Sequence, residues 1–231
     1  MNRPYTLINV AITADGKMDT FERKGSAISS KQDKERVDQL RADADAVLVG
    51  GKTLLGEYPK LTVKSEALRE SRVKRGMPPN PIKVGVVTSA DIPLESDFIQ
   101  AGPARVVIFT TSQTSSSHLE TLRGGGVEVF VDEAPRVDLK KMMGRLREIG
   151  VKRLMVEGGG TINFELLRLG LIDELTIYIA PIILGGEHAP TLASGLGLAR
   201  SEAIALKLTN VVSHRDGGIL LNYTLEDTHE A

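Results

Sequence analysis

Cysteine is absent from the 231 residues of this chain, and aromatic side chains make up only 4% of it. The lack of cysteine excludes a disulfide framework, a thiol nucleophile and a metal site with cysteine ligands. It also fits a reducing compartment, so we expect a soluble protein of the cytoplasm. Aromatic residues that are few and not interleaved with basic ones argue against a surface on which nucleic-acid bases stack.

Neither sign of charge dominates, because 29 basic side chains face 30 acidic ones. No overall field therefore attracts nucleic acid or an anionic membrane, and an anionic ligand would need a local cluster. The longest apolar stretch, LTIYIAPIILGG at 175–186, is far shorter than the ~18 residues of a membrane span. The four histidines have no metal-ligand spacing, and we expect no metal site.

Short apolar segments recur along the chain, and most are continuously apolar, as in strands buried on both faces of a sheet. The predicted strands are 5–13, 46–50, 82–87, 105–109, 127–131, 153–156 and 174–183. Helical patterns lie between them, the best at 139–149 after a capping Asp138 and before Gly150. This alternation predicts an α/β fold with a mainly parallel sheet and right-handed crossovers.

The C-terminal segment 203–227 differs, because its two strand-like halves are joined by Arg215-Asp216-Gly217-Gly218. These residues suit a hairpin turn, so we expect a mixed sheet with an antiparallel hairpin at its end. The charged stretch 64–81, with its three prolines, is interpreted as a surface helix and loop. No repeat or linker divides the chain, which predicts a single domain over residues 1–231.

The segment VEGGGT at 156–161 places an acid and three glycines between a predicted strand and a predicted helix. Ligands of open α/β sheets bind beyond the carboxyl ends of the parallel strands. Glycines let a phosphate approach backbone N–H groups at a helix N-terminus, and Glu157 would point into the same crevice. The alternative is a tight turn with a solvated acid, and a lone GGG is a weak motif.

Two further places attract attention. Arg41 shares the predicted buried stripe of a helix with Val37, Leu40 and Ala44, so it needs an anionic partner. Three alternatives remain: Arg41 pairs with an internal acid, its side chain extends to bring the guanidinium into water, or it pairs with a ligand phosphate. The stretch GGKTLLGEYPKLTVK at 50–64 repeats the strand-glycine-helix order, with Thr53 inside the next turn.

These segments together resemble the riboflavin-pathway reductases, which share the dihydrofolate-reductase-like fold. The matching segments are NVAITADGK (9–17), RVDQLRADADAVLVGGKTLLGEYPKLTVK (36–64), NPIKVGVVTS (80–89) and VEGGGTINFELLRLGLIDELTIYIAPIILGG (156–186). The resemblance implies an NADPH-dependent oxidoreductase acting on a sugar C1′, with NADH as the alternative coenzyme. It further implies a homodimer. The implied reaction reduces the ribosyl group of 2,5-diamino-6-ribosylamino-4(3H)-pyrimidinone 5′-phosphate to ribityl.

The resemblance also implies roles for individual residues. The positions that match cofactor contacts are Thr53, Glu57, Ser89, Gly158, Gly159, Gly160 and Thr161. The positions that match contacts to the pyrimidine nucleotide are Arg41, Leu61, Lys64 and Glu157, and Glu157 would accept hydrogen bonds at the reacting pyrimidine. Lys64 stands where the family often has arginine, so it would meet a phosphate as a point charge and not as a fork.

The bacterial fused form of the family begins with a zinc deaminase that has a cysteine- and histidine-based site. This chain has no cysteine and starts directly at the reductase, so we expect the stand-alone type that acts on the diamino substrate. Other readings stay open: reduction of the deaminated 5-amino-6-ribosylaminouracil 5′-phosphate, reduction of another carbonyl such as a pterin, or a non-catalytic nucleotide sensor on the same fold.

Overall fold

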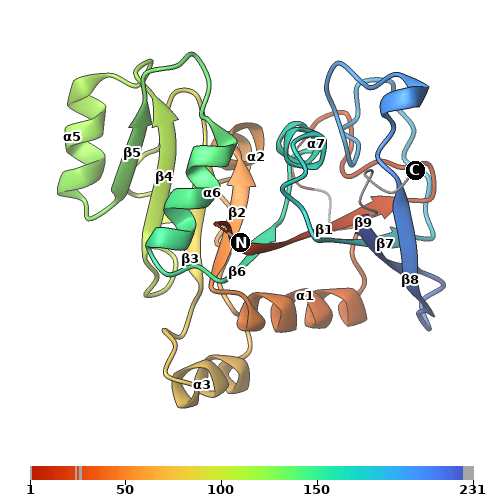
Figure 1. The fold of residues 1–231 in the computed structure, drawn as a ribbon. Helices are drawn as coiled ribbons and strands as arrows, with labels where there is room; N and C mark the ends of the chain where they lie inside the picture. Colours follow the sequence, from red (N-terminus) through yellow and green to blue (C-terminus); the bar gives the residue numbers. More distant parts are fainter. Residues whose placement is uncertain (1, 24, 26–27, 226–231) are drawn as a thin grey trace. The chain divides into compact units, whose positions relative to one another are not determined.

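The computed structural model describes residues 2–23, 25 and 28–225. Over these residues the chain is an α/β protein with nine mostly parallel strands, seven α-helices and one short 3-10 helix (Figure 1). In chain order the elements are β1 (Tyr5–Thr13), α1 (Lys31–Asp43), β2 (Ala46–Gly50), α2 (Gly51–Glu57), α3 (Glu66–Lys74), β3 (Ile82–Val86), α4 (Asp97–Gln100), β4 (Val106–Thr111), α5 (Ser116–Gly124), β5 (Glu128–Asp132), α6 (Leu139–Glu148), β6 (Arg153–Val156), α7 (Gly160–Arg168), β7 (Glu174–Ala180), η1 (Arg200–Glu202), β8 (Leu206–Ser213) and β9 (Ile219–Leu225).

The predicted α/β class is confirmed, and each predicted strand is present. The largest error is at β7, which was expected to continue to residue 183 but ends at Ala180. Pro181 follows, and proline has no N–H to donate to a strand ladder. The predicted helix after Asp138 is confirmed as α6, and the Asp138 carboxylate caps it by accepting from the N–H groups of Lys140 and Lys141.

The chain groups into two compact units, each assembled from separate stretches of sequence. The first contains Val37–Met155 and the N-terminal residues before Tyr5. The second contains the described residues of Tyr5–Arg36 and of 156–225. The strand β6 runs from the end of the first unit into the start of the second.

The first unit is built on the parallel strands β2, β3, β4 and β5, with β3 between β2 and β4. Helix α2 packs against β2 and β3, and α5 packs against β5. Gly85 of β3 permits this packing, because a Cβ there would lie 2.6 Å from a methyl group of Leu54 on α2. Leu54 is fully buried in the hydrophobic cluster of this unit, so α2 is held directly on the sheet.

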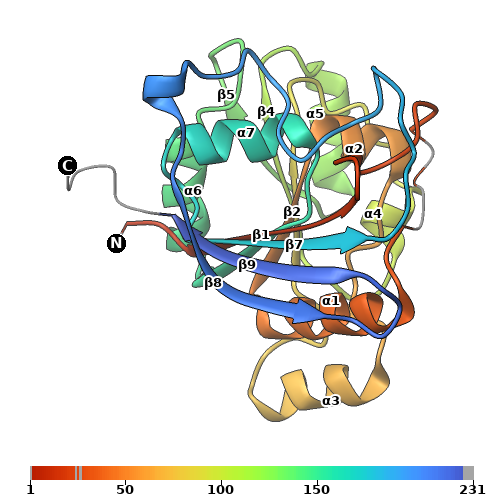
Figure 2. The same cartoon turned by 90° about the vertical axis from the view of Figure 1, so that its right-hand side faces the viewer.

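The second unit pairs β1 with β7 in parallel, and β9 lies antiparallel between β7 and β8. Helix α7 lies over one face of β1 and β7 (Figure 2). The predicted C-terminal hairpin is confirmed for β8 and β9, while Glu226 and Asp227 lie outside the described residues. Its turn uses Gly217 at a φ of 87° and the carboxylate of Asp216, which accepts from the Gly218 N–H.

The charged stretch 64–81 forms α3 and a loop, as expected, with one exception. Arg72 was interpreted as a surface residue, but its side chain is buried, with an exposed fraction of 1%. Its guanidinium donates to the carbonyl oxygens of Arg41, Ala42, Ala44 and Pro78. Burial is tolerated because these four carbonyls replace the water that a cation would otherwise need.

A second buried cation lies near the start of β3. Lys83 has an exposed fraction of 0% and donates from Nζ to the carbonyl oxygens of Phe98, at 2.8 Å, and Ala101, at 2.6 Å. Burial disfavours the charged amine and lowers the pKa of Lys83 from 10.5 to about 8. The lysine thus links β3 to carbonyl groups within and just after α4.

This pKa predicts a pH-dependent contribution to stability. Between pH 8 and 10.5 the folded chain has released the Lys83 proton and the unfolded chain still binds it, so the free energy of unfolding rises with pH. We expect the free energy of unfolding of the unsubstituted chain to rise, relative to that of Lys83→Met, by on the order of 2 kcal/mol from the lower to the upper end of this window. Urea unfolding of both proteins at several pH values measures this change. If the unsubstituted chain gains no stability relative to Lys83→Met as the pH rises, the lowered pKa of Lys83 would be contradicted.

No helix of the described residues combines the length and the apolar character that crossing a membrane requires.

Candidate functional site

The carboxyl ends of β2 and β3 form one edge of the first unit. Gly50 pairs with Val86, so the two strands end side by side. Helix α2 starts immediately at Gly51, where an added Cβ would lie 3.0 Å from a methyl group of Val87. A side chain at this position would crowd Val87 and the Val86 carbonyl, so glycine favours this close approach of the helix start to the end of β3. The glycines after β2 therefore set where α2 begins.

Thr53 and Glu57 lie one turn apart on α2, so their side chains share one face of the helix. Thr53 is half-buried and Glu57 is exposed. Ser89 follows β3 at the same edge of the unit and is half-buried. The structure thus places Thr53 and Ser89 three residues beyond two neighbouring strand ends, whereas Glu57 is the last residue of α2.

The segment that carries Ser89 is fixed by threonines of the next strand and its following turn. The Thr88 carbonyl accepts from the hydroxyls of Thr110, at 3.1 Å, and Thr111, at 2.8 Å. The Ala90 N–H donates to the hydroxyl of Thr114 at 2.9 Å. The sequence prediction missed these residues, although the hydroxyl-rich run after residue 109 was a visible signal.

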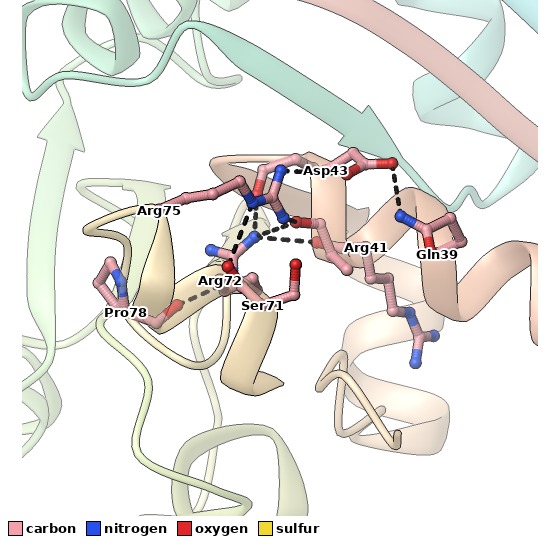
Figure 3. A network of polar contacts seen from close by, with 9 residues as sticks. Gln39, Arg41, Asp43, Ser71, Arg72, Arg75 and Pro78 are labelled. Atoms are coloured by element: carbon pink, nitrogen blue, oxygen red, sulfur yellow. Dashed lines mark hydrogen bonds and ion pairs between the residues drawn. The ribbon is translucent and has the colours of Figure 1, made fainter. Parts of the chain in front are cut away.

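Arg41 lies in the last turn of α1 and is half-buried. Its Nη1 donates to the Thr62 carbonyl at 3.0 Å. Figure 3 shows its guanidinium pointing away from those of Arg72 and Arg75, which reach the same end of α1. A main-chain carbonyl is therefore one partner of Arg41, and it is not among the partners that the sequence analysis considered, which were an internal acid, water and a ligand phosphate.

Leu61 and Lys64 lie on the segment between α2 and α3. The Leu61 side chain is 1% exposed and packs in the hydrophobic cluster of the first unit, so a ligand contact by Leu61 would use its backbone. Its φ of 50° is unusual for a residue with a side chain. Lys64 is exposed, and its backbone N–H donates to Asp38 at 2.6 Å. Sequence reasoning did not single out Asp38.

The Glu157 turn has the order of strand, glycine turn and helix that the sequence predicted. Glu157 follows the end of β6 directly and is half-buried. Gly158 has a φ of 102°, which side-chain-bearing residues rarely adopt, and Gly159 forms the N-cap of α7. Helix α7 begins at Gly160, and Thr161 is exposed in its first turn.

The third glycine has a structural role that the sequence did not reveal. A Cβ on Gly160 would lie 2.4 Å from the Thr191 carbonyl oxygen and 2.7 Å from the Ser194 hydroxyl. The Ser194 N–H donates to the Gly160 carbonyl at 3.0 Å, and Asn163 Nδ2 donates to the Leu192 carbonyl at 2.9 Å. The chain around residues 191–194 therefore packs against the first turn of α7.

The Asp-Gly turn at 15–16 is an ordinary turn with a fixed carboxylate. Gly16 has a φ of 82°. Asp15 accepts from the Thr13 hydroxyl and from the N–H groups of Leu184 and Gly185. These bonds, led by the Thr13 hydroxyl, hold the pKa of Asp15 at about 2. The turn thereby ties the end of β1 to the chain after β7.

Each unit offers a distinct chemistry. The first presents the hydroxyls of Thr53 and Ser89 close to adjacent strand ends, the Glu57 carboxylate at the end of α2, and the exposed Lys64 on the segment after α2. The second presents a half-buried carboxylate beside a glycine turn and the start of α7. Among the residues that the structure describes, no group of three or more histidine, aspartate or glutamate side chains is arranged to hold a metal ion.

Comparison with known proteins gives consistent matches. The model of the RibD C-terminal domain family matches residues 4–220. The 2,5-diamino-6-ribosylamino-4(3H)-pyrimidinone 5′-phosphate reductase of Archaeoglobus fulgidus is 40% identical over 193 residues, which cover 84% of this chain and 87% of the relative. The reductase of the same name from Methanothermobacter thermautotrophicus is 38% identical, with coverages of 89% and 91%. The crystal structure of a pyrimidine reductase-like protein from Corynebacterium diphtheriae has a TM-score of 0.81 at 22% identity, covering 98% of this chain and 93% of that one.

Proposed function

Because this chain belongs to the RibD C-terminal domain family, we propose that it reduces the ribosyl group of 2,5-diamino-6-ribosylamino-4(3H)-pyrimidinone 5′-phosphate to ribityl with NADPH. The observation that carries the proposal is the match, over most of both chains, to reductases named for that substrate. Glu157 at the mouth of β6 supports it, because a half-buried carboxylate is suited to accept hydrogen bonds from ring N–H groups.

The residues at the strand ends suit a dinucleotide. The hydroxyls of Thr53 and Ser89 are groups that can donate to phosphate oxygens, and the Glu57 carboxylate can accept from ribose hydroxyls. In the second unit, Gly159 and Thr161 at the start of α7 would offer backbone N–H groups to the diphosphate. The nicotinamide, when bound, supplies the hydride that reduces C1′ of the sugar. The protein binds and orients the two ligands.

The residues proposed to hold the substrate differ in chemistry. Glu157 would orient the pyrimidine through its N–H groups, and Lys64 would pair with the 5′-phosphate as an exposed cation. Arg41 would contribute further donors to substrate oxygens, beside the bond from its Nη1 to Thr62.

The test is oxidation of NADPH, followed by its absorbance, with the purified chain and the diamino pyrimidine. We expect turnover with this substrate, and parallel reactions with the deaminated uracil compound and with NADH assign substrate and coenzyme. Thermal stabilisation by both ligands without oxidation would instead favour a nucleotide sensor. No turnover and no stabilisation would overturn the proposal.

We also propose that residues 1–231 act as one reductase domain. Each compact unit is assembled from two separate stretches of the chain, and the chain passes between the units more than once. The family match from residue 4 to residue 220 extends over both units. Dividing the chain into two domains at the unit boundaries would therefore divide the region that matches the family.

A homodimer is the expected assembly, and the hairpin supports it. All eight residues of β8 are exposed, and the exposed apolar side chains include Leu208 at 49% and Val211 at 52%. An apolar edge strand is an aggregation hazard unless another chain covers it. We expect light scattering at micromolar concentration to give twice 24.9 kDa, and Leu208→Glu to shift the mass towards 24.9 kDa. A mass of 24.9 kDa for the unsubstituted chain would refute the dimer.

A further inference from the structure

The segment 61–65 is the second part of the connection from α2 to α3 and has no regular secondary structure. Under the proposed function, it carries two substrate positions, Leu61 and Lys64. Its backbone is nevertheless bonded by side chains from α1, from α3 and from the loop before β3.

Two side chains of α1 hold this segment. The Asp38 carboxylate is buried, with an exposed fraction of 7%, and accepts from the N–H groups of Lys64, at 2.6 Å, and Ser65, at 2.8 Å. Arg41 donates to the Thr62 carbonyl at 3.0 Å. Since Asp38 and Arg41 are three residues apart, they lie on the same face of α1 and bind the segment together.

Three further backbone groups of the segment are bonded to side chains of other elements. Arg69 of α3 donates from Nη1 to the carbonyl oxygens of Val63, at 2.9 Å, and Lys64, at 2.7 Å. The Asn80 side-chain oxygen accepts from the Val63 N–H at 3.0 Å. Backbone groups that usually bond to strand neighbours or water are here bonded to side chains.

A loop that only connects two helices does not need this many side chains bonded to its backbone. Leu61 has a φ of 50°, and an ordinary residue keeps such a conformation only where its surroundings enforce it. The segment is therefore ordered before any ligand binds, so no binding free energy is lost in ordering it.

We propose that Asp38 is a positioning residue for the substrate, because its carboxylate fixes the Lys64 and Ser65 amides and thereby places Lys64 for the substrate phosphate. This inference rests on the proposed function. Asp38 does not touch substrate in this role and acts through the segment. Arg69 supports the same segment from α3.

Asp38→Asn is the sharpest test. It keeps the size of the side chain, but its NH2 group would face an N–H that now bonds to an oxygen. We expect KM for the pyrimidine substrate to rise about tenfold, with kcat and the NADPH dissociation constant within about twofold. Asp43→Asn is the matched control on α1, since Asp43 is 42% exposed and pairs with Arg75. It should change none of these values.

Two measurements separate positioning from a structural role alone. Hydrogen exchange at the Lys64 and Ser65 amides should accelerate in Asp38→Asn and not in Asp43→Asn. In a Lys64→Met background, Asp38→Asn should raise KM by less than about twofold, because contacting partners are not additive. Unchanged KM in Asp38→Asn, or a full tenfold effect without Lys64, would overturn the positioning role.

A second variant covers the case in which Asp38→Asn does not fold. Arg69 is half-buried, and Arg69→Gln should raise KM in the same way. Lys74 on the same helix is exposed, and Lys74→Gln should leave KM unchanged. An unchanged KM in Arg69→Gln would then overturn the inference. Failure of the proposed function is distinct, because the unsubstituted chain would then show no turnover at all.

Discussion

Replacing Arg72 with methionine is expected to lower the free energy of unfolding by about 3 kcal/mol. The guanidinium is 1% exposed and donates to four backbone carbonyls, three of which lie at the end of α1. Methionine fills much of the same space but leaves these carbonyls without their donor. Each buried acceptor that loses its partner costs about 1–3 kcal/mol.

One effect opposes this loss. Burial lowers the pKa of Arg72, which means that the folded state pays to keep the cation away from water. Methionine removes that cost, so the net effect is smaller than the sum over four hydrogen bonds. The loss of donors still dominates, because an α-helix end carries partial negative charge that the cation meets directly.

Arg75 provides the matched control, and Figure 3 shows it beside Arg72 at the end of α1. Its side chain is 44% exposed, and it donates to Ala42 and pairs with Asp43 at 3.3 Å. Arg75→Met should cost less than about 1 kcal/mol, since water replaces an exposed partner readily. Urea unfolding of both variants makes the comparison. Equal effects, or no effect of Arg72→Met, would contradict the assigned role of the buried guanidinium.

Glu157→Gln is expected to lower kcat/KM for the pyrimidine substrate by about 10–100-fold, because the loss of a charge-assisted hydrogen bond costs roughly 1.5–3 kcal/mol. The amide has the same shape as the carboxylate, so the turn that contains Gly158 should fold unchanged. NADPH affinity should also stay within about twofold, since Glu157 is assigned to the pyrimidine and the following turn to the cofactor.

Glu165→Gln is the control for this experiment. Glu165 lies on α7 and pairs with Arg168 at 2.7 Å, with 28% of its side chain exposed. The same change of charge on the helix that follows the glycine turn should leave kcat/KM unchanged. Full turnover by Glu157→Gln would mean that Glu157 is only a solvated acid at a strand end. A loss of NADPH affinity would mean that the two ligands were assigned to the wrong residues.

The strands and the best helix could be predicted from sequence because their signals are local. A continuous apolar run marks β2, and the stripe after Asp138 marks α6. The position of Glu157 at a strand end, followed by a helix, came from the same local order of residues. These features depend on side chains a few positions apart, so a linear pattern contains them.

The two buried cations could not be predicted in this way. Lys83 lies inside an apolar strand, and Arg72 lies in a charged stretch that reads as surface. Each is buried because carbonyl oxygens from other parts of the chain surround it. Whether a charge is exposed or paired with such carbonyls depends on how the chain folds back, which residue type and spacing do not encode.

The site divides along the same line. The sequence by itself determined that Thr53, Ser89 and Glu157 follow strands, and thus that they lie where ligands of α/β proteins bind. Only the tertiary structure decided that Gly160 is small because Thr191 packs against it, and that Asp38 holds the backbone of Lys64. Both facts join residues more than 20 positions apart, and such contacts form only when separate elements pack together.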